Sequence, residues 1–152
     1  MKVYLGRIFT VPIFLGIFVL GTSQISSASD KDGLRFSAVG EKIQNNLQDL
    51  SIHAKEVFTD ESSEILWFGQ FQLFQQIHQS IIKVEWIKPD GSLYREHSYK
   101  PDPIHAPFTW SKLDIKGVDK EVLSIKGEWS VHVSKDGVLI DNKTFWVGYP
   151  VY

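Results

Sequence analysis

The chain has no cysteine, and its single methionine is the initiator. Without cysteine the protein cannot form a disulfide, carry a lipid on a thiol or bind a metal through thiolates. Its stability must therefore come from a hydrophobic core. Of its 152 residues, 13% are aromatic, which is enough to build such a core in one domain of this size.

Motifs of the common catalytic classes are also missing. The sequence contains no Gly-x-Ser-x-Gly segment for a nucleophilic serine and no glycine-rich phosphate loop. The acid pairs Asp60–Glu61 and Asp119–Glu121 fall in segments predicted as loops, whereas a glycosidase must hold two carboxylates across a cleft. We therefore expect no enzymatic activity and no cofactor. A hydrolase whose site is assembled from loops is the second alternative.

The basic residues do not gather into a stretch. Removing residues 1–28 takes away two of the 16 basic residues and none of the 18 acidic residues, which leaves a net charge of −4 with neutral histidine. Proteins that bind nucleic acid usually carry a basic patch or stripe. We therefore expect no nucleic-acid partner.

The N-terminal segment has the layout of a secretory signal. Lys2 and Arg7 form a basic start, Ile8–Leu20 is almost wholly apolar, and a small, polar stretch follows. We expect residues 1–28 to be cleaved and the protein to be exported. In the alternative, Ile8–Ser29 stays uncleaved and spans a membrane, which is then the only membrane contact. An exported chain without disulfides fits a bacterial periplasm or the extracellular space.

The next segment gives weaker signals. Leu34–Ser37 could form a short strand, and Glu41–Leu50 has apolar residues at helical spacing but is too short for a stable helix. We assign residues 29–48 to a linker or short helical turn and residues 49–152 to the folded domain. Alternating apolar residues predict that Leu50–Phe58 is its first secure strand.

Two hairpins give the clearest strand patterns. Trp86 and Trp129 each belong to a row of apolar residues that alternates with polar ones, which places one apolar row on one face of a strand. Each of these strands runs into an Asp-Gly turn. Ile65–Ile77 is compatible with a strand or a helix. Its aromatic residues and Gly69 favour a strand.

About seven short strands separated by turn signals predict an all-β fold, a sandwich of two antiparallel sheets. We expect Trp86 and Trp129 to be buried between the sheets. Four motifs stand out in residues 49–148: Gly127-x-Trp129-x-Val131-x-Val133, Asp136-Gly137, Phe145-x-Val147 and the Trp86…Pro89-Asp90-Gly91 segment. Through these motifs the chain resembles bacterial exported immunoglobulin-like domains. The resemblance implies an immunoglobulin-like sandwich of a group that includes adhesion, assembly and ligand-binding domains.

Four aromatic residues are the candidates for a binding surface. Tyr99, Phe108 and Trp110 flank a loop with three prolines, and Trp146 points opposite to the apolar row of the last strand. Exposed rings beside a rigid loop could bind a protein or an envelope polymer. In the alternative, the same rings cap the end of the core. Our preferred hypothesis is an exported, non-catalytic sandwich that binds such a partner.

Histidine provides the alternative function. The chain has five histidines, and none of them form an HxH or HxxxH arrangement. His97 and His105 are eight residues apart, and the loop between them could bring their imidazoles together to bind copper or zinc, with His78 as a further ligand. The alternative hypothesis is therefore a periplasmic metal-binding protein.

Overall fold

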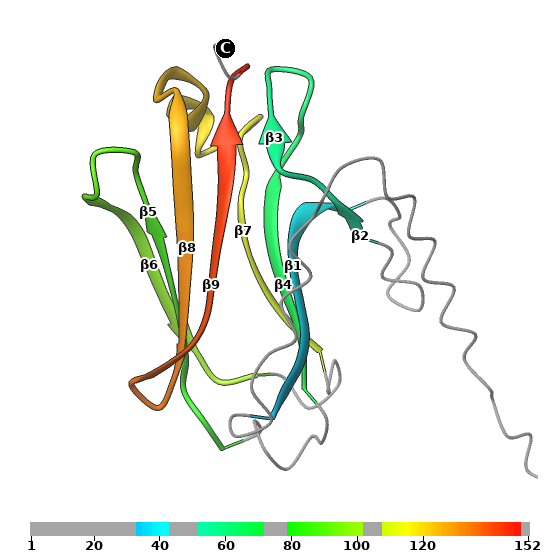
Figure 1. Ribbon diagram of the computed structural model, residues 1–152, viewed down its shortest axis with the longest axis vertical. Coiled ribbons are helices and arrows are strands. Elements are labelled where there is room, and N and C mark those ends of the chain that lie inside the picture. The colour runs from blue at the N-terminus through cyan, green and yellow to red at the C-terminus, as the bar shows by residue number, and fades with distance from the viewer. Residues whose placement is uncertain (1–32, 43–51, 72–78, 102–107, 150–152) are drawn as a thin grey trace, which may run out of the picture.

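The computed structural model describes residues 33–42, 52–71, 79–101 and 108–149, which form two β-sheets packed face to face (Figure 1). The predicted signal at 1–28 lies outside these residues. Within the described ranges, no helix has the length and apolar character needed to cross a membrane.

The four-stranded sheet has the order β2-β1-β4-β7, and all its pairs are antiparallel. Its strands are β1 (Leu34–Lys42), β2 (Ile52–Ala54), β4 (Ile65–Phe71) and β7 (Phe108–Leu113). The five-stranded sheet has the order β3-β9-β8-β5-β6 and is antiparallel except where β3 pairs with β9. Its strands are β3 (Val57–Phe58), β5 (Ile82–Ile87), β6 (Leu93–Tyr99), β8 (Gly127–Lys135) and β9 (Val138–Val147).

A short 3₁₀-helix, η3 (Lys120–Ser124), lies in the connection between β7 and β8. The predicted all-β sandwich is confirmed, with nine strands among the described residues instead of about seven.

The first strand lies inside the range predicted as a linker. β1 pairs along most of its length with β4, and Leu34 and Val39 belong to the core. This strand is hard to recognise from the sequence, because apolar residues on both of its faces remove the alternating pattern and a register shift follows Leu34. The folded domain therefore includes residues well before position 49. The remainder of the predicted linker, 43–48, lies outside the described residues.

The prediction of a single strand over Leu50–Phe58 was wrong. The described part of this stretch forms two short strands, β2 and β3, which belong to different sheets. The chain changes sheets at two consecutive residues. The Lys55 N–H donates to the Val39 carbonyl of β1 at 3.0 Å, and the Glu56 carbonyl accepts from the Trp146 N–H of β9 at 2.7 Å. The alternation of apolar and polar residues along the sequence does not show where a chain passes from one sheet to the other.

The strand interpretation of the ambiguous segment is confirmed for Ile65–Phe71. A side chain at Gly69 would meet the Trp67 ring, because an added Cβ would lie 2.7 Å from a ring carbon. This matches the close approach expected at that glycine. Residues 72–77 lie outside the described residues.

Two indole hydrogen bonds cross the core between the sheets. The Trp86 Nε1–H of β5 donates to Ser111 Oγ of β7 at 3.3 Å, and the Trp67 Nε1–H of β4 donates to Asp141 Oδ2 of β9 at 2.8 Å. Trp86 and Trp129 are both fully buried, as predicted. Burial of each such side chain contributes roughly 1.5–3 kcal/mol or more.

Candidate binding surfaces

The outer faces of the two sheets differ in chemistry. Side chains alternate between the core and the outside along each strand. On the five-stranded sheet the outward residues are mostly polar or charged: Lys83, Glu85, Glu128, Ser130, His132, Asn142 and Thr144. On the four-stranded sheet they are mainly apolar: Phe36, Ala38, Leu66, Phe68, Phe108 and Trp110.

The aromatic rings of this apolar surface come from three neighbouring strands. We name Phe36, Phe68, Phe108 and Trp110 the aromatic face. Phe68 on the central strand β4 has its ring centroid 6.5 Å from that of Phe36 and 5.5 Å from that of Phe108, with which it stacks at 24°. Trp110 lies opposite Phe68 in the strand register. Phe68 is buried and the other three rings are half-buried, so the four residues form one cluster with Phe68 at its centre.

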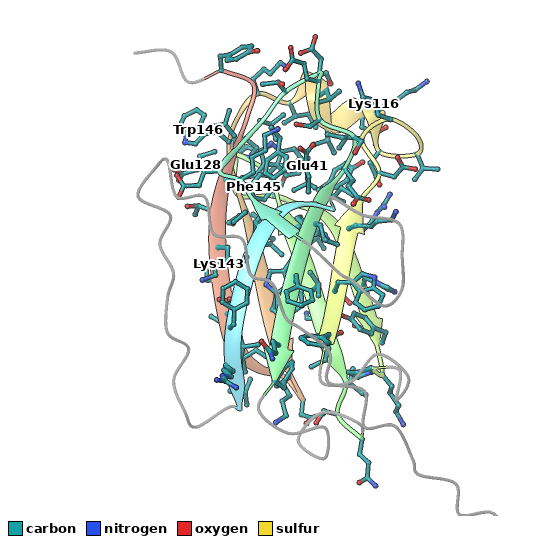
Figure 2. All side chains as sticks on the ribbon, turned by 90° about the vertical axis from the view of Figure 1, so that its right-hand side faces the viewer. Glu41, Lys116, Glu128, Lys143, Phe145 and Trp146 are labelled. Carbon is teal, nitrogen blue, oxygen red and sulfur yellow. The ribbon has the colours of Figure 1, made fainter. Side chains whose placement is uncertain are left out.

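Two of the four predicted binding residues, Phe108 and Trp110, belong to this aromatic face. Trp146 lies on the other sheet, opposite Glu128, and is 37% exposed. Figure 2 shows Trp146 and Glu128 pointing away from the sandwich, whereas Phe145 points into it. The structure therefore does not gather the four rings into one patch.

Tyr99 lies at the seam between the edge strands β6 and β7. Its hydroxyl is 2.7 Å from Thr109 Oγ1 and donates to the Trp110 carbonyl at 3.0 Å. Burial raises the pKa of Tyr99 to about 12, and the hydrogen bond with Thr109 opposes this shift. Tyr99 thus joins the two sheets at their edges, which is a structural role.

The Tyr99 phenol predicts a loss of stability at high pH. The unfolded tyrosine titrates near pH 10, and the folded pKa is about 12. The contribution of Tyr99 to the free energy of unfolding should be constant below about pH 10 and should fall as the pH rises through the folded pKa. The reason is that the unfolded chain releases a proton that the folded chain keeps. Urea unfolding at a series of pH values measures this slope. The Tyr99→Phe variant should show a shallower slope, and an equal slope would contradict the assignment.

The histidine pair is only partly described. His97 is exposed on β6, with its ring centroid 4.9 Å from that of Tyr99. His105 and His78 lie outside the described residues. Among the residues that the structure does describe, no three or more His, Asp or Glu side chains form a group that could hold a metal ion. Metal binding by His97 and His105 stays a prediction.

The acids considered for catalysis have different positions. Asp60 and Glu61 are exposed in a turn, whereas Asp119 is only 1% exposed. Asp119 accepts hydrogen bonds from Arg95, from the Tyr94 hydroxyl at 3.1 Å and from the Asp114 N–H at 2.8 Å. This network fastens the β7–β8 connection to β6. The sequence pattern gave no sign of it, because Arg95 and Asp119 are far apart along the chain.

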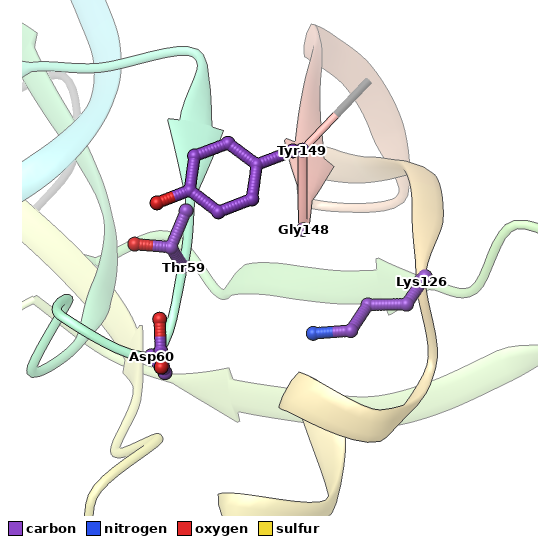
Figure 3. A pocket seen from close by; sticks show the side chains of 5 residues that line it. All are labelled: Thr59, Asp60, Lys126, Gly148 and Tyr149. Atoms are coloured by element: carbon purple, nitrogen blue, oxygen red, sulfur yellow. The ribbon is translucent and has the colours of Figure 1, made fainter. Parts of the chain in front are cut away.

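A shallow pocket of about 320 Å³ lies at the end of the sandwich where β3 and β9 finish (Figure 3). It is lined by Thr59, Asp60, Lys126, Gly148 and Tyr149. Asp60 is the single acid among these five residues, and none of them is a histidine or serine. The pocket therefore lacks both the paired acids and the serine–histidine pair that a hydrolase site requires.

Comparison with known proteins relates this architecture to solved structures. No protein-family model matches the chain, and no curated protein matches it significantly. The chain is similar in structure to an immunoglobulin-like protein from Pseudomonas aeruginosa, with a TM-score of 0.52 and 17% sequence identity over 74% of this chain and 91% of that one. At this identity the likeness concerns the fold alone. The chain therefore has the fold of an immunoglobulin-like β-sandwich.

Proposed function

We propose that this chain is an exported, non-catalytic bacterial domain that binds another protein through the aromatic face of its four-stranded sheet. The observation that carries the proposal is the apolar character of that outer face, set against the polar outer face of the other sheet. Export is supported by the signal-like sequence of residues 1–28 and by the resemblance to exported domains. The periplasm and the extracellular space are both compatible with it.

The composition of the aromatic face favours a protein partner. Aromatic side chains are enriched at protein interfaces, where they bring a large apolar area at a small entropic cost. Here they are accompanied by the aliphatic Leu66 and Ala38. An envelope polysaccharide presents many hydroxyl groups, which lose free energy when buried without polar partners. A protein segment with apolar side chains therefore fits this surface better than a polymer of sugars.

Site-specific photocrosslinking in the native envelope tests this proposal. A photoreactive phenylalanine derivative is placed at Trp110 on the aromatic face, and at Ser130 on the opposite outer face as a matched control. We expect a protease-sensitive adduct from position 110 and none from position 130. A protease-resistant adduct that a glycosidase removes would overturn the assignment to a protein, and equal adducts from both positions would remove the role of the aromatic face.

The size of the effect can then be measured with the captured partner. A central aromatic anchor typically contributes about 2 kcal/mol or more to binding, which corresponds to roughly 30-fold in affinity. We expect Trp110→Ala to weaken binding by about this factor and Trp146→Ala to leave it unchanged, as measured by titration calorimetry. An unchanged affinity for Trp110→Ala would contradict the proposed surface.

A further inference from the structure

The pocket at the end of the sandwich carries two opposite charges. The Asp60 carboxylate and the Lys126 ammonium both line it, and both residues are exposed. In the part of the chain that the structure describes, neither side chain forms an ion pair or a hydrogen bond, with the other or with a third residue. Each charge is therefore available to a ligand.

The position of Lys126 depends on a glycine at the end of β9. Gly148 has a φ of +87°, and an added Cβ would lie 2.7 Å from Lys126 Cδ, so the lysine stem lies where any larger residue would have its side chain. The Gly148 N–H donates to the Phe58 carbonyl at 2.7 Å, which holds this backbone against β3. Figure 3 shows the Lys126 ammonium pointing into the pocket, toward Thr59 and Asp60.

Asp60 lies in a turn whose backbone is held from several sides. The Ser62 N–H donates to the Thr59 carbonyl at 3.0 Å, and the Thr59 N–H donates to Ser62 Oγ at 3.2 Å. Lys116 Nζ donates to the Asp60 carbonyl, and Lys55 Nζ donates to Ser62 Oγ at 2.8 Å. These bonds leave the Asp60 carboxylate without a partner. A site whose backbone is fixed in advance loses less entropy when a ligand binds.

The rest of the pocket suits a small ligand with an apolar part. The Tyr149 side chain is 73% exposed and offers its ring as an apolar wall. Ligand pockets usually have volumes of about 300–1,000 Å³, and this pocket of about 320 Å³ lies at the lower end of that range. A donor for a carboxylate, an acceptor for an ammonium and an apolar surface thus meet in the space of one small molecule.

We propose that this pocket binds a zwitterionic α-amino acid with an aliphatic side chain. Lys126 binds the ligand carboxylate, Asp60 binds the ligand ammonium, and the aliphatic part lies against the Tyr149 ring. Charge selects such a ligand, because Asp60 repels a simple anion and Lys126 repels a simple cation. The inference goes beyond the proposed function and does not depend on it, since no residue of the pocket belongs to the aromatic face.

Three ligands with the same branched carbon skeleton test the recognition of both charges. Leucine carries both groups, isocaproate lacks the ammonium and isoamylamine lacks the carboxylate. We expect leucine to shift the amide resonances of Thr59, Asp60 and Gly148 in an NMR titration of the isotope-labelled protein, with saturation in the millimolar range. Each of the other two should bind about five-fold more weakly or less well still. Absence of saturable shifts with leucine would overturn the proposal, and so would equal affinity for leucine and either partial ligand.

Two variants should affect the ligands in opposite ways. Lys126→Gln should weaken the binding of leucine and isocaproate without weakening that of isoamylamine. Asp60→Asn should weaken the binding of leucine and isoamylamine without weakening that of isocaproate. Lys120→Gln and Glu61→Gln are the matched controls, because both residues are exposed, lie close to these positions in the chain and do not line the pocket. Equal losses in the control variants would overturn the proposal, since the effect would then come from the general charge of the surface.

Discussion

Replacing Trp86 by alanine is expected to lower the free energy of unfolding by about 3–5 kcal/mol. The Trp86 side chain is 0% exposed and packs edge-on against Phe145, with ring centroids 6.0 Å apart. Alanine would leave a cavity between the sheets. It would also remove the indole N–H that donates a hydrogen bond to Ser111 Oγ. Domains of this size are stable by about 5–15 kcal/mol in total, so the loss is a large fraction. Urea unfolding followed by circular dichroism measures it.

Trp146→Ala is the matched control for this prediction. Trp146 lies on the outer face of the same sheet and is 37% exposed. Its replacement should change the free energy of unfolding by about 0.5 kcal/mol or little more, as for most surface positions. If Trp86→Ala and Trp146→Ala cost the same, Trp86 is not a core residue and the facing arrangement of the sheets is wrong.

The hairpins of the five-stranded sheet could be predicted from the sequence for a physical reason. This sheet has one face in the core and one face in water, so apolar and polar residues alternate along its strands. β5 and β8 show this pattern, and their tryptophans are buried as expected. The turns after them were recognisable from Asp-Gly pairs.

The four-stranded sheet was harder to predict, because its outer face is apolar as well. Leu66 and Phe68 are buried on the side of β4 opposite to Trp67. Without alternation, Ile65–Ile77 was compatible with a strand or a helix, and β1 was assigned to a linker. The feature that obscured these strands is the same feature that forms the aromatic face.

The contacts between distant segments could not be predicted at all. The passage of the chain from one sheet to the other between β2 and β3 depends on the hydrogen-bond partners of the backbone groups of Lys55 and Glu56. The bonds from Arg95 to Asp119 and from Trp67 to Asp141 join residues that are far apart in sequence. Candidate residues could be named from the sequence, but their grouping depends on the sheet order. Phe108 and Trp110 share a face with Phe36 and Phe68, whereas Trp146 lies on the other sheet.

Asp119→Ala should lower the free energy of unfolding by about 2–3 kcal/mol. The change leaves the Asp114 N–H and the Arg95 guanidinium without the carboxylate that they share. Breaking a fully buried ion pair costs about 3–5 kcal/mol. Arg95 is 39% exposed, so water can solvate its charge again and the loss should lie below that range. Thermal and urea unfolding both measure it.

Glu121→Gln is the control for this prediction. It tests whether the loss of stability is specific to the buried Asp119 carboxylate or follows from removing any acidic charge in the β7–β8 connection. Glu121 is exposed and accepts a hydrogen bond from the same Tyr94 hydroxyl, at 2.9 Å. Its amide replacement keeps an acceptor for that hydroxyl, so stability should be unchanged within error. Asp119→Asn should fall between the two variants, because it keeps one acceptor oxygen and loses the charge that pairs with Arg95. If Glu121→Gln destabilises the domain as much as Asp119→Ala, the β7–β8 connection is not held by Asp119.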